Sequence, residues 1–275
     1  MRIKDNFHTH IYLCKHATGN AENYVKKAIN LGYESIGISD HGPILEHYNE
    51  KFYSRRMNFD EYYNIYLKEI KEAKEVFSKN INVLGALEIV FYDDMIDIYR
   101  KNLTELDYLI LGQHNIELPD GTFKTVYKCS TVEDLELYTN KVVKGLNSGF
   151  FSILAHPDIF MMFYQKWDNS AILSAKKIIE AAIKNNVLLE LNANGIRKGL
   201  ITTTEGLRTY KYPRIEFWRL VATYKDAKII VSDDAHEVHH LNDYATHEAY
   251  KIAEELNLNI EEAFTERIKK IKLNN

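Results

Sequence analysis

The chain has 275 residues, of which 45% are hydrophobic, and this is enough for one large α/β domain or two small ones. Its 35 basic and 39 acidic residues leave a net charge of −4 and are spread along the chain, which excludes a basic face for nucleic acid. The chain has no stretch near the roughly 18 apolar residues of a membrane span and no apolar run of the signal-peptide type at its start, so we expect a soluble cytoplasmic protein.

Short apolar runs alternate along the chain with longer stretches in which apolar residues recur every three or four positions. This alternation predicts repeated strand and helix units around a parallel sheet. The seven predicted strands are 4–8, 35–39, 82–87, 108–112, 151–155, 187–191 and 228–232. The helical patterns cover 21–31, 59–78, 131–148, 171–186 and 216–224, and an amphipathic pattern at 259–272 ends the fold.

Glycine and proline are sparse, at 12 and 4, and no linker-like stretch divides the chain, so we expect a single domain over residues 1–275. The most polar irregular region, 195–214, follows the sixth strand, where a loop over the mouth of a barrel would lie. The apolar residues 160–163 are expected in the core rather than in a lid. Cys14 and Cys129 are too few for a disulfide framework or a thiolate zinc site.

Each predicted strand ends in, or is soon followed by, potential metal ligands. In barrels of alternating strands and helices the carboxyl ends of the strands converge on one face, where active sites lie. Histidine nitrogen and carboxylate oxygen suit Zn²⁺, Mn²⁺ or Fe²⁺, and the number of candidates exceeds what one ion needs, so we expect a multinuclear centre. The candidates are His8, His10, Asp40, His41, Glu88, His114, His156, Glu190, Asp234 and His236.

His8 and His10 are two positions apart, which places both side chains on one face of a strand, where they can hold one ion. Asp234 and His236 repeat this spacing near the other end of the chain. Any one histidine taken alone is more often a surface or hydrogen-bonding residue, and it is the joint placement at strand ends that indicates a metal site. The histidines expected at the surface instead are His47, His239, His240 and His247.

These motifs resemble the polymerase and histidinol phosphatase (PHP) family of metal-dependent phosphoesterases, in its histidinol-phosphatase type. The resemblance implies a distorted seven-stranded (β/α)7 barrel similar to a TIM barrel, in agreement with the seven strands counted above. The matching segments follow the family's order over nearly the whole chain and are His8-Thr9-His10, His16, Ser39-Asp40-His41, 85–88, 112–114, 155–157 and 234–236.

The resemblance further implies a centre of two or three divalent ions, Zn, Mn or Fe, with Glu88 as the bridging ligand. The implied ligands are His8, His10, Glu88 and Asp234 for the first ion, Glu88, His114 and His156 for the second, and His16, His41 and His236 for the third.

The implied activity is that of a phosphoric monoester hydrolase, with attack on phosphorus by a hydroxide held between two ions. Asp234 or His236 would pass the proton to the departing alcohol. The expected substrate is L-histidinol phosphate, which places the enzyme in histidine biosynthesis. Because a guanidinium can bind phosphate through two hydrogen bonds, Arg197 is expected to bind the substrate, together with Gln113 and Lys211.

The chain departs from the expected pattern near position 160, where a histidinol-phosphate enzyme would carry basic residues and this chain is apolar. Another phosphorylated metabolite therefore stays open as the substrate. A phosphodiesterase or nuclease of the same family is a second interpretation, opposed by the pI of about 6.3 and the lack of an aromatic and basic strip. A metal-binding protein without turnover is a third, opposed by a full ligand set next to an arginine. The sequence leaves the metal and the oligomeric state open.

Overall fold

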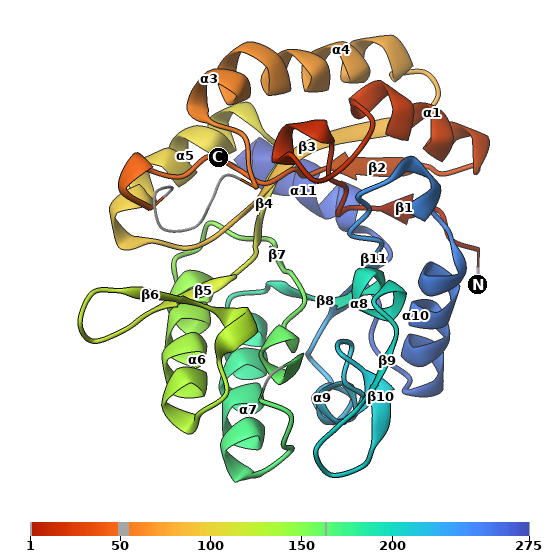
Figure 1. The fold of residues 1–275 in the computed structure, drawn as a ribbon. Coiled ribbons are helices and arrows are strands. Elements are labelled where there is room, and N and C mark those ends of the chain that lie inside the picture. Colours follow the sequence, from red (N-terminus) through yellow and green to blue (C-terminus); the bar gives the residue numbers. More distant parts are fainter. Residues whose placement is uncertain (1, 49–54, 163, 275) are drawn as a thin grey trace.

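The computed structural model describes residues 2–48, 55–162 and 164–274, and its centre is one sheet of seven parallel strands. The strand order around the sheet is the chain order, so the sheet curls into a nearly closed barrel with helices outside it (Figure 1). This confirms the predicted seven-stranded barrel, and each strand overlaps its predicted position. The strands are β1 (Asp5–Asn6), β2 (Ser35–Ile38), β3 (Asn82–Ile89), β4 (Tyr108–Leu111), β7 (Ile153–Leu154), β8 (Leu188–Asn192) and β11 (Ile229–Ser232).

Six helical elements lie where the apolar periodicity predicts them, with a π-helical turn, η2 (Tyr62–Tyr66), interrupting the second pattern. Two further helices of at least ten residues in the described part of the chain escaped prediction because their apolar stripes are weak. Helix α5 (Ile96–Glu105) buries only Tyr99 and Asn102, and α10 (Tyr244–Glu255) is buried mainly through alanines. The predicted helices are α1 (Ala21–Asn30), α3 (Phe59–Glu61) with α4 (Leu67–Phe77), α6 (Val132–Asn147), α7 (Asn169–Lys184), α9 (Ile215–Val221) and α11 (Phe264–Asn274). None of the helices in the described part of the chain is both long and apolar enough to span a lipid bilayer.

The barrel closes through the residues that follow its first and last strands. Thr9 forms a parallel bridge with Ala235. The N–H of His10 donates to the Ala235 carbonyl at 2.8 Å, and the N–H of Ala235 donates to the His8 carbonyl at 3.2 Å. A second bridge joins His41 to Glu88. The contacts of Ala235 with the segment around Thr9 bring together residues that lie more than 200 positions apart in the sequence.

Two antiparallel hairpins extend from the carboxyl end of the barrel. One is formed by β5 (Asn115–Glu117) and β6 (Phe123–Thr125), and the other by β9 (Leu200–Thr202) and β10 (Arg208–Tyr210). The second hairpin occupies the region 195–214, so this region is ordered by strand pairing and is not the irregular loop that its polar composition indicates. The region 195–214 begins in the short helix α8 (Ala193–Arg197), which precedes the hairpin.

Apolar side chains fill the interior of the barrel, and α11 covers its amino end. The ring of Phe264 meets Phe7 at 4.7 Å and Tyr108 at 5.1 Å between centroids, both edge to face. Helix α11 also contacts residues at or before the starts of strands, since Thr265 donates to Ser35 at 2.9 Å. Phe160 and Met161 are buried in the main core, as predicted, Met162 packs against it, and position 163 lies outside the described residues. We call the interior set the barrel core: Phe7, Leu84, Ala86, Tyr108, Ile110, Ile153, Ala155, Leu188, Ile230, Phe264 and Ile268.

Candidate metal centre

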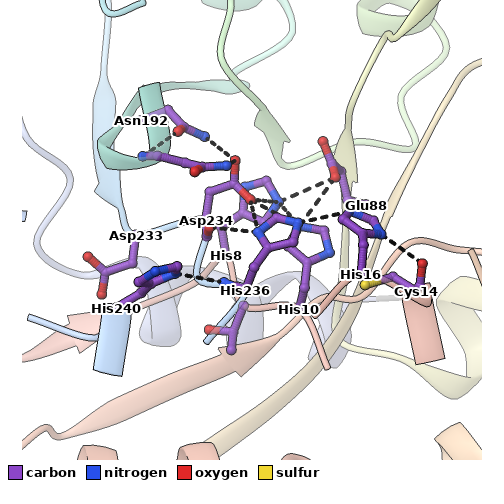
Figure 2. A network of polar contacts seen from close by, with 12 residues as sticks. His8, His10, Cys14, His16, Glu88, Asn192, Asp233, Asp234, His236 and His240 are labelled. Carbon is purple, nitrogen blue, oxygen red and sulfur yellow. Dashed lines mark hydrogen bonds and ion pairs between the residues drawn. The ribbon is translucent and has the colours of Figure 1, made fainter. Parts of the chain in front are cut away.

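The residues predicted to bind metal converge at the carboxyl end of the barrel, although they come from both ends of the chain. Figure 2 shows several of these imidazoles and carboxylates pointing toward one another. His8 and His10 follow β1 and are fully buried, and Glu88 lies within β3. The others follow β2, β4, β7 and β11 or the short helix η1 (Tyr12–Cys14), and they are His16, His41, His114, His156, Asp234 and His236.

The carboxylate of Glu88 lies between two groups of histidines and faces each group with a different oxygen. Its Oε2 lies 3.5 Å from Nε2 of both His8 and His10. Its Oε1 lies 3.1 Å from Nε2 of His156 and 3.5 Å from Nε2 of His114. A carboxylate that bridges two ions must present one oxygen to each, and Glu88 has this arrangement.

Imidazole nitrogens meet in three close pairs. Nε2 of His8 lies 3.0 Å from Nε2 of His10, and Asp234 Oδ1 lies 3.1 Å from the latter. At such distances two unprotonated nitrogens direct their lone pairs at the same point, which a divalent cation can occupy. The other Nε2 pairs are His114 with His156 at 3.3 Å and His16 with His236 at 3.1 Å.

His41 lies next to the third pair without joining it directly. Its ring centroid is 5.3 Å from that of His16 and 6.5 Å from that of His236. Its Nδ1 lies 3.0 Å from Oε2 of Glu88. The third predicted ligand group is therefore assembled in one place, with His41 turned toward the bridging carboxylate.

The cluster combines ionised carboxylates with imidazoles whose pKa values are raised and imidazoles whose pKa values are lowered. Burial raises the pKa of Glu88, but the neighbouring His41, His114 and His8 outweigh it and hold this pKa well below its usual range. Burial alone would lower the pKa of His8, yet nearby carboxylates, Glu190 first, raise it to about 10. Burial lowers the pKa of His114 to about 3, so that imidazole is neutral. Buried anions beside neutral nitrogen donors suit divalent cations.

Several of the rings are held from behind by a hydrogen bond to the nitrogen that faces away from the cluster. His16 Nδ1 donates to the Cys14 carbonyl at 2.7 Å, and His236 Nδ1 donates to the Asp234 carbonyl at 3.0 Å. Nδ1 of His10 lies 3.3 Å from Oδ1 of Asp40. A proton on Nδ1 leaves the lone pair of Nε2 available for a metal, so these contacts favour the tautomer that binds.

Two of the predicted ligands occupy strained backbone. His156 has φ of 32° and Asp234 has φ of 45°, a left-handed region that non-glycine residues visit at a cost of about 1–3 kcal/mol. Gly112 leaves the space that Glu88 requires, since a Cβ there would lie 2.2 Å from Glu88 Oε1. The fold thus tolerates local strain where it places these ligands.

The three residues predicted to bind substrate lie outside the cluster. The guanidinium of Arg197 donates to both carboxylate oxygens of Asp243, at 2.6 and 3.1 Å, and also to the His240 carbonyl at 2.9 Å. Gln113 is buried, accepts from the Phe91 N–H at 3.2 Å and donates to the Asn115 carbonyl at 2.7 Å. Lys211 is partly buried and does not line the cavity over the cluster. Substrate binding by these three residues therefore stays a prediction without a supporting contact.

The cavity over the cluster has a volume of about 270 Å³ and contains two basic residues that the sequence analysis missed, Arg55 and Lys198. Lys198 Nζ donates to the hydroxyl of Tyr212 at 2.6 Å. Neither residue ends a strand: Lys198 directly follows Arg197, and Arg55 lies between β2 and α3, so strand-end reasoning could not select them. The remaining lining residues are His16, His41, Glu88, His114, Tyr127, His156, Asn194, Tyr212, Asp234 and His236.

Comparison with known proteins gives one family and several relatives. The model of the PHP domain matches residues 6–194. A probable phosphatase of Clostridium acetobutylicum is 25% identical over 238 residues, which cover 86% of this chain and 80% of the relative. A probable histidinol-phosphatase of Deinococcus radiodurans is 24% identical, with 84% of this chain and 85% of the relative covered.

Two solved structures share the fold at 17% sequence identity. HisK of Listeria monocytogenes superposes with a TM-score of 0.69, covering 89% of this chain and 99% of its own. Histidinol phosphate phosphatase of Lactococcus lactis, solved with zinc, L-histidinol and phosphate, has a TM-score of 0.67, with 94% and 95% covered.

Proposed function

Because this chain belongs to the PHP domain family and is a phosphatase of that family, we propose that its substrate is L-histidinol phosphate, which it hydrolyses to L-histidinol and phosphate. The observation that carries the proposal is the bridging geometry of Glu88, whose two oxygens face two separate histidine groups beneath a cavity that Arg55 and Lys198 also line. The name of the Lactococcus lactis relative and the ligands in its structure support this choice of alcohol.

The donor set fits two or three divalent ions, and we propose that the three Nε2 pairs hold one each, with Zn, Mn or Fe as the metal. Such ions would neutralise phosphoryl oxygens and lower the pKa of a water from about 15.7 toward about 7. Asp234 and His236 remain the proposed catalytic residues. Oδ2 of Asp234 accepts from the amides of Asn192 and Asn194 at 3.1 and 3.0 Å, which leaves Oδ1 to face the cluster.

We propose Lys198 and Arg55 as the groups that bind the phosphate, because both line the cavity while Arg197 is engaged by Asp243. The pKa of Lys198 lies below its usual value, mainly because the side chain is buried. The charges of Asp234 and Glu88 act against this shift, whereas the positive charge of Lys211 adds to it. Lys211 thus adds positive charge near the cavity without lining it. A cationic donor hydrogen-bonded to phosphate contributes about 1.5–3 kcal/mol, or roughly 10- to 100-fold in affinity.

The test is a phosphate-release screen over phosphorylated metabolites and one nucleotide diester, with the protein loaded with Mn²⁺ or Zn²⁺. We expect the highest kcat/KM for L-histidinol phosphate and no release in excess chelator. A higher kcat/KM for another ester would refute the substrate, and release that persists in chelator would refute the metal dependence.

Lys198→Met examines the proposed phosphate contact in the same screen. We expect KM to rise roughly 10- to 100-fold, with the bound metal unchanged by elemental analysis. Lys176→Met, which removes an exposed lysine of α7, is the matched control and should leave KM unchanged. An unchanged KM in Lys198→Met would assign the phosphate to other residues.

A further inference from the structure

We infer that Glu190, which belongs to none of the three ligand groups of the proposed centre, is a positioning residue that fixes both halves of the metal centre and thereby sets its affinity for divalent cations. This inference rests on the metal centre of the proposed function. Glu190 is fully buried in the middle of β8. Its position near the end of the predicted strand 187–191 makes it a potential ligand in the sequence, but its two oxygens contact the ring of His8, the backbone of His156 and the side chain of Asn192.

The first oxygen of Glu190 fixes the ring of His8. Oε1 lies 2.7 Å from Nδ1 of His8, while Nε2 of the same ring faces His10 and Glu88. A ring that binds a cation through Nε2 is neutral and carries one proton, and an acceptor at Nδ1 holds that proton there. The lone pair of Nε2 is then directed into the cluster in a fixed orientation.

The second oxygen holds the backbone of His156. Oε2 accepts from the N–H of His156 at 3.1 Å, at the residue whose φ is 32°. Within the described ranges, the buried Nδ1 of His156 has no hydrogen-bond partner, so no hydrogen bond orients the ring from behind, although Tyr212 packs against it with ring centroids 5.9 Å apart. Its position therefore depends on the backbone, and the bond to Glu190 is the side-chain anchor of that backbone.

The same oxygen reaches a third ligand through Asn192. Nδ2 of Asn192 donates to Glu190 Oε2 at 2.8 Å and to Asp234 Oδ2 at 3.1 Å (Figure 2 shows the latter pair). Glu190 is thus connected to His8 and Asp234 of the first proposed ion and to His156 of the second. One buried carboxylate supports ligands of two ions without lying between them.

The test is Glu190→Gln, measured as divalent-ion affinity of the full chain without substrate. An amide has one acceptor oxygen, so its NH₂ group must face either Nδ1 of His8 or the N–H of His156. Facing His156 it meets a second donor and that contact is lost, and facing His8 it donates to Nδ1 and moves the imidazole proton to Nε2, the nitrogen that should bind the cation. We expect Co²⁺ and Zn²⁺ to bind about 10- to 100-fold more weakly in chelator-buffered titrations, with a changed Co²⁺ absorption spectrum. Because no substrate is present, failure on L-histidinol phosphate would leave this result intact.

Two further variants separate positioning from general stability. Asp134→Asn alters another buried carboxylate, one that accepts from the N–H of Ser130 at 2.9 Å and contacts none of the ligands; it should lower stability and leave metal affinity unchanged. Glu190→Asp keeps the charge but is too short for both contacts, and it should also weaken binding at least tenfold. Metal affinity within twofold of the parent in either folded Glu190 variant would overturn the inference.

Discussion

At the amino end of the barrel, Phe264 of α11 packs edge to face on Phe7 and Tyr108, and apolar side chains fill the interior. At the carboxyl end the same seven strands lead into buried imidazoles and carboxylates, two of them on strained backbone. Burial of such polar groups costs free energy, whereas burial of apolar side chains stabilises the folded state. The difference implies that the apolar amino end contributes to stability, and that the carboxyl end is built for binding cations.

The largest effect on activity should follow from Glu88→Gln, which alters the metal centre at the carboxyl end and leaves the amino end unchanged. The variant keeps the size of the side chain but removes the charge that faces both histidine groups. Charge stabilisation by bridged ions is worth several kcal/mol, and each 1.36 kcal/mol is tenfold in rate. We expect kcat/KM for the phosphate ester to fall about 10³-fold or more, together with loss of bound metal in elemental analysis.

The fold of this variant should survive, since Glu88 does not belong to the barrel core. Glu117→Gln, at an exposed carboxylate of β5, serves as the control and should keep full activity. Full metal content in Glu88→Gln would contradict the bridging role, whatever the activity.

Phe264→Ala instead removes apolar packing at the amino end of the barrel and leaves the metal centre unchanged. Phe264 is 1% exposed, and truncation of a buried phenylalanine typically costs 3–5 kcal/mol. We expect a loss of unfolding free energy of about that size in urea titration, with metal affinity unchanged in the folded protein. Leu273→Ala on the same helix, where the side chain is 85% exposed, should change stability by less than about 0.5 kcal/mol. A parallel loss of metal affinity in Phe264→Ala would show that the two ends are coupled.

Both the sheet and the convergence of the candidate ligands could be predicted from sequence patterns. Strand spacing places His8 and His10 on one face, and parallel strands bring His114 and His156 to the same end of the barrel. The seven strands and the burial of Phe160 followed from apolar patterns in the same way.

Three side-chain arrangements depend on contacts made only after folding. The chemistry of Arg197 suits phosphate, but Asp243 of the unpredicted α10 region engages its guanidinium. Lys198 enters the cavity because the β9–β10 hairpin places Tyr212 beside it, and pairing within that hairpin is not visible in its polar composition. Glu190 could be chosen as a ligand candidate but not as a support, because its role depends on where each oxygen points.

The smallest effect concerns a single carboxyl group, that of Asp5, at the amino end of β1. Burial raises the pKa of Asp5 to about 6, with Lys4 lowering it and Glu34 raising it. The unfolded value is about 3.9, so between about pH 4 and 6 the folded state binds more protons and the free energy of unfolding falls as pH rises. Asp5→Asn removes this loss. Allowing for partial exposure, we expect a gain of about 1 kcal/mol at pH 7, or roughly 2–4 °C in Tm, and none near pH 4. Because the metal-free carboxyl end titrates identically in both proteins, its contribution cancels in the difference, and a gain in Tm that is independent of pH would contradict the assignment to Asp5.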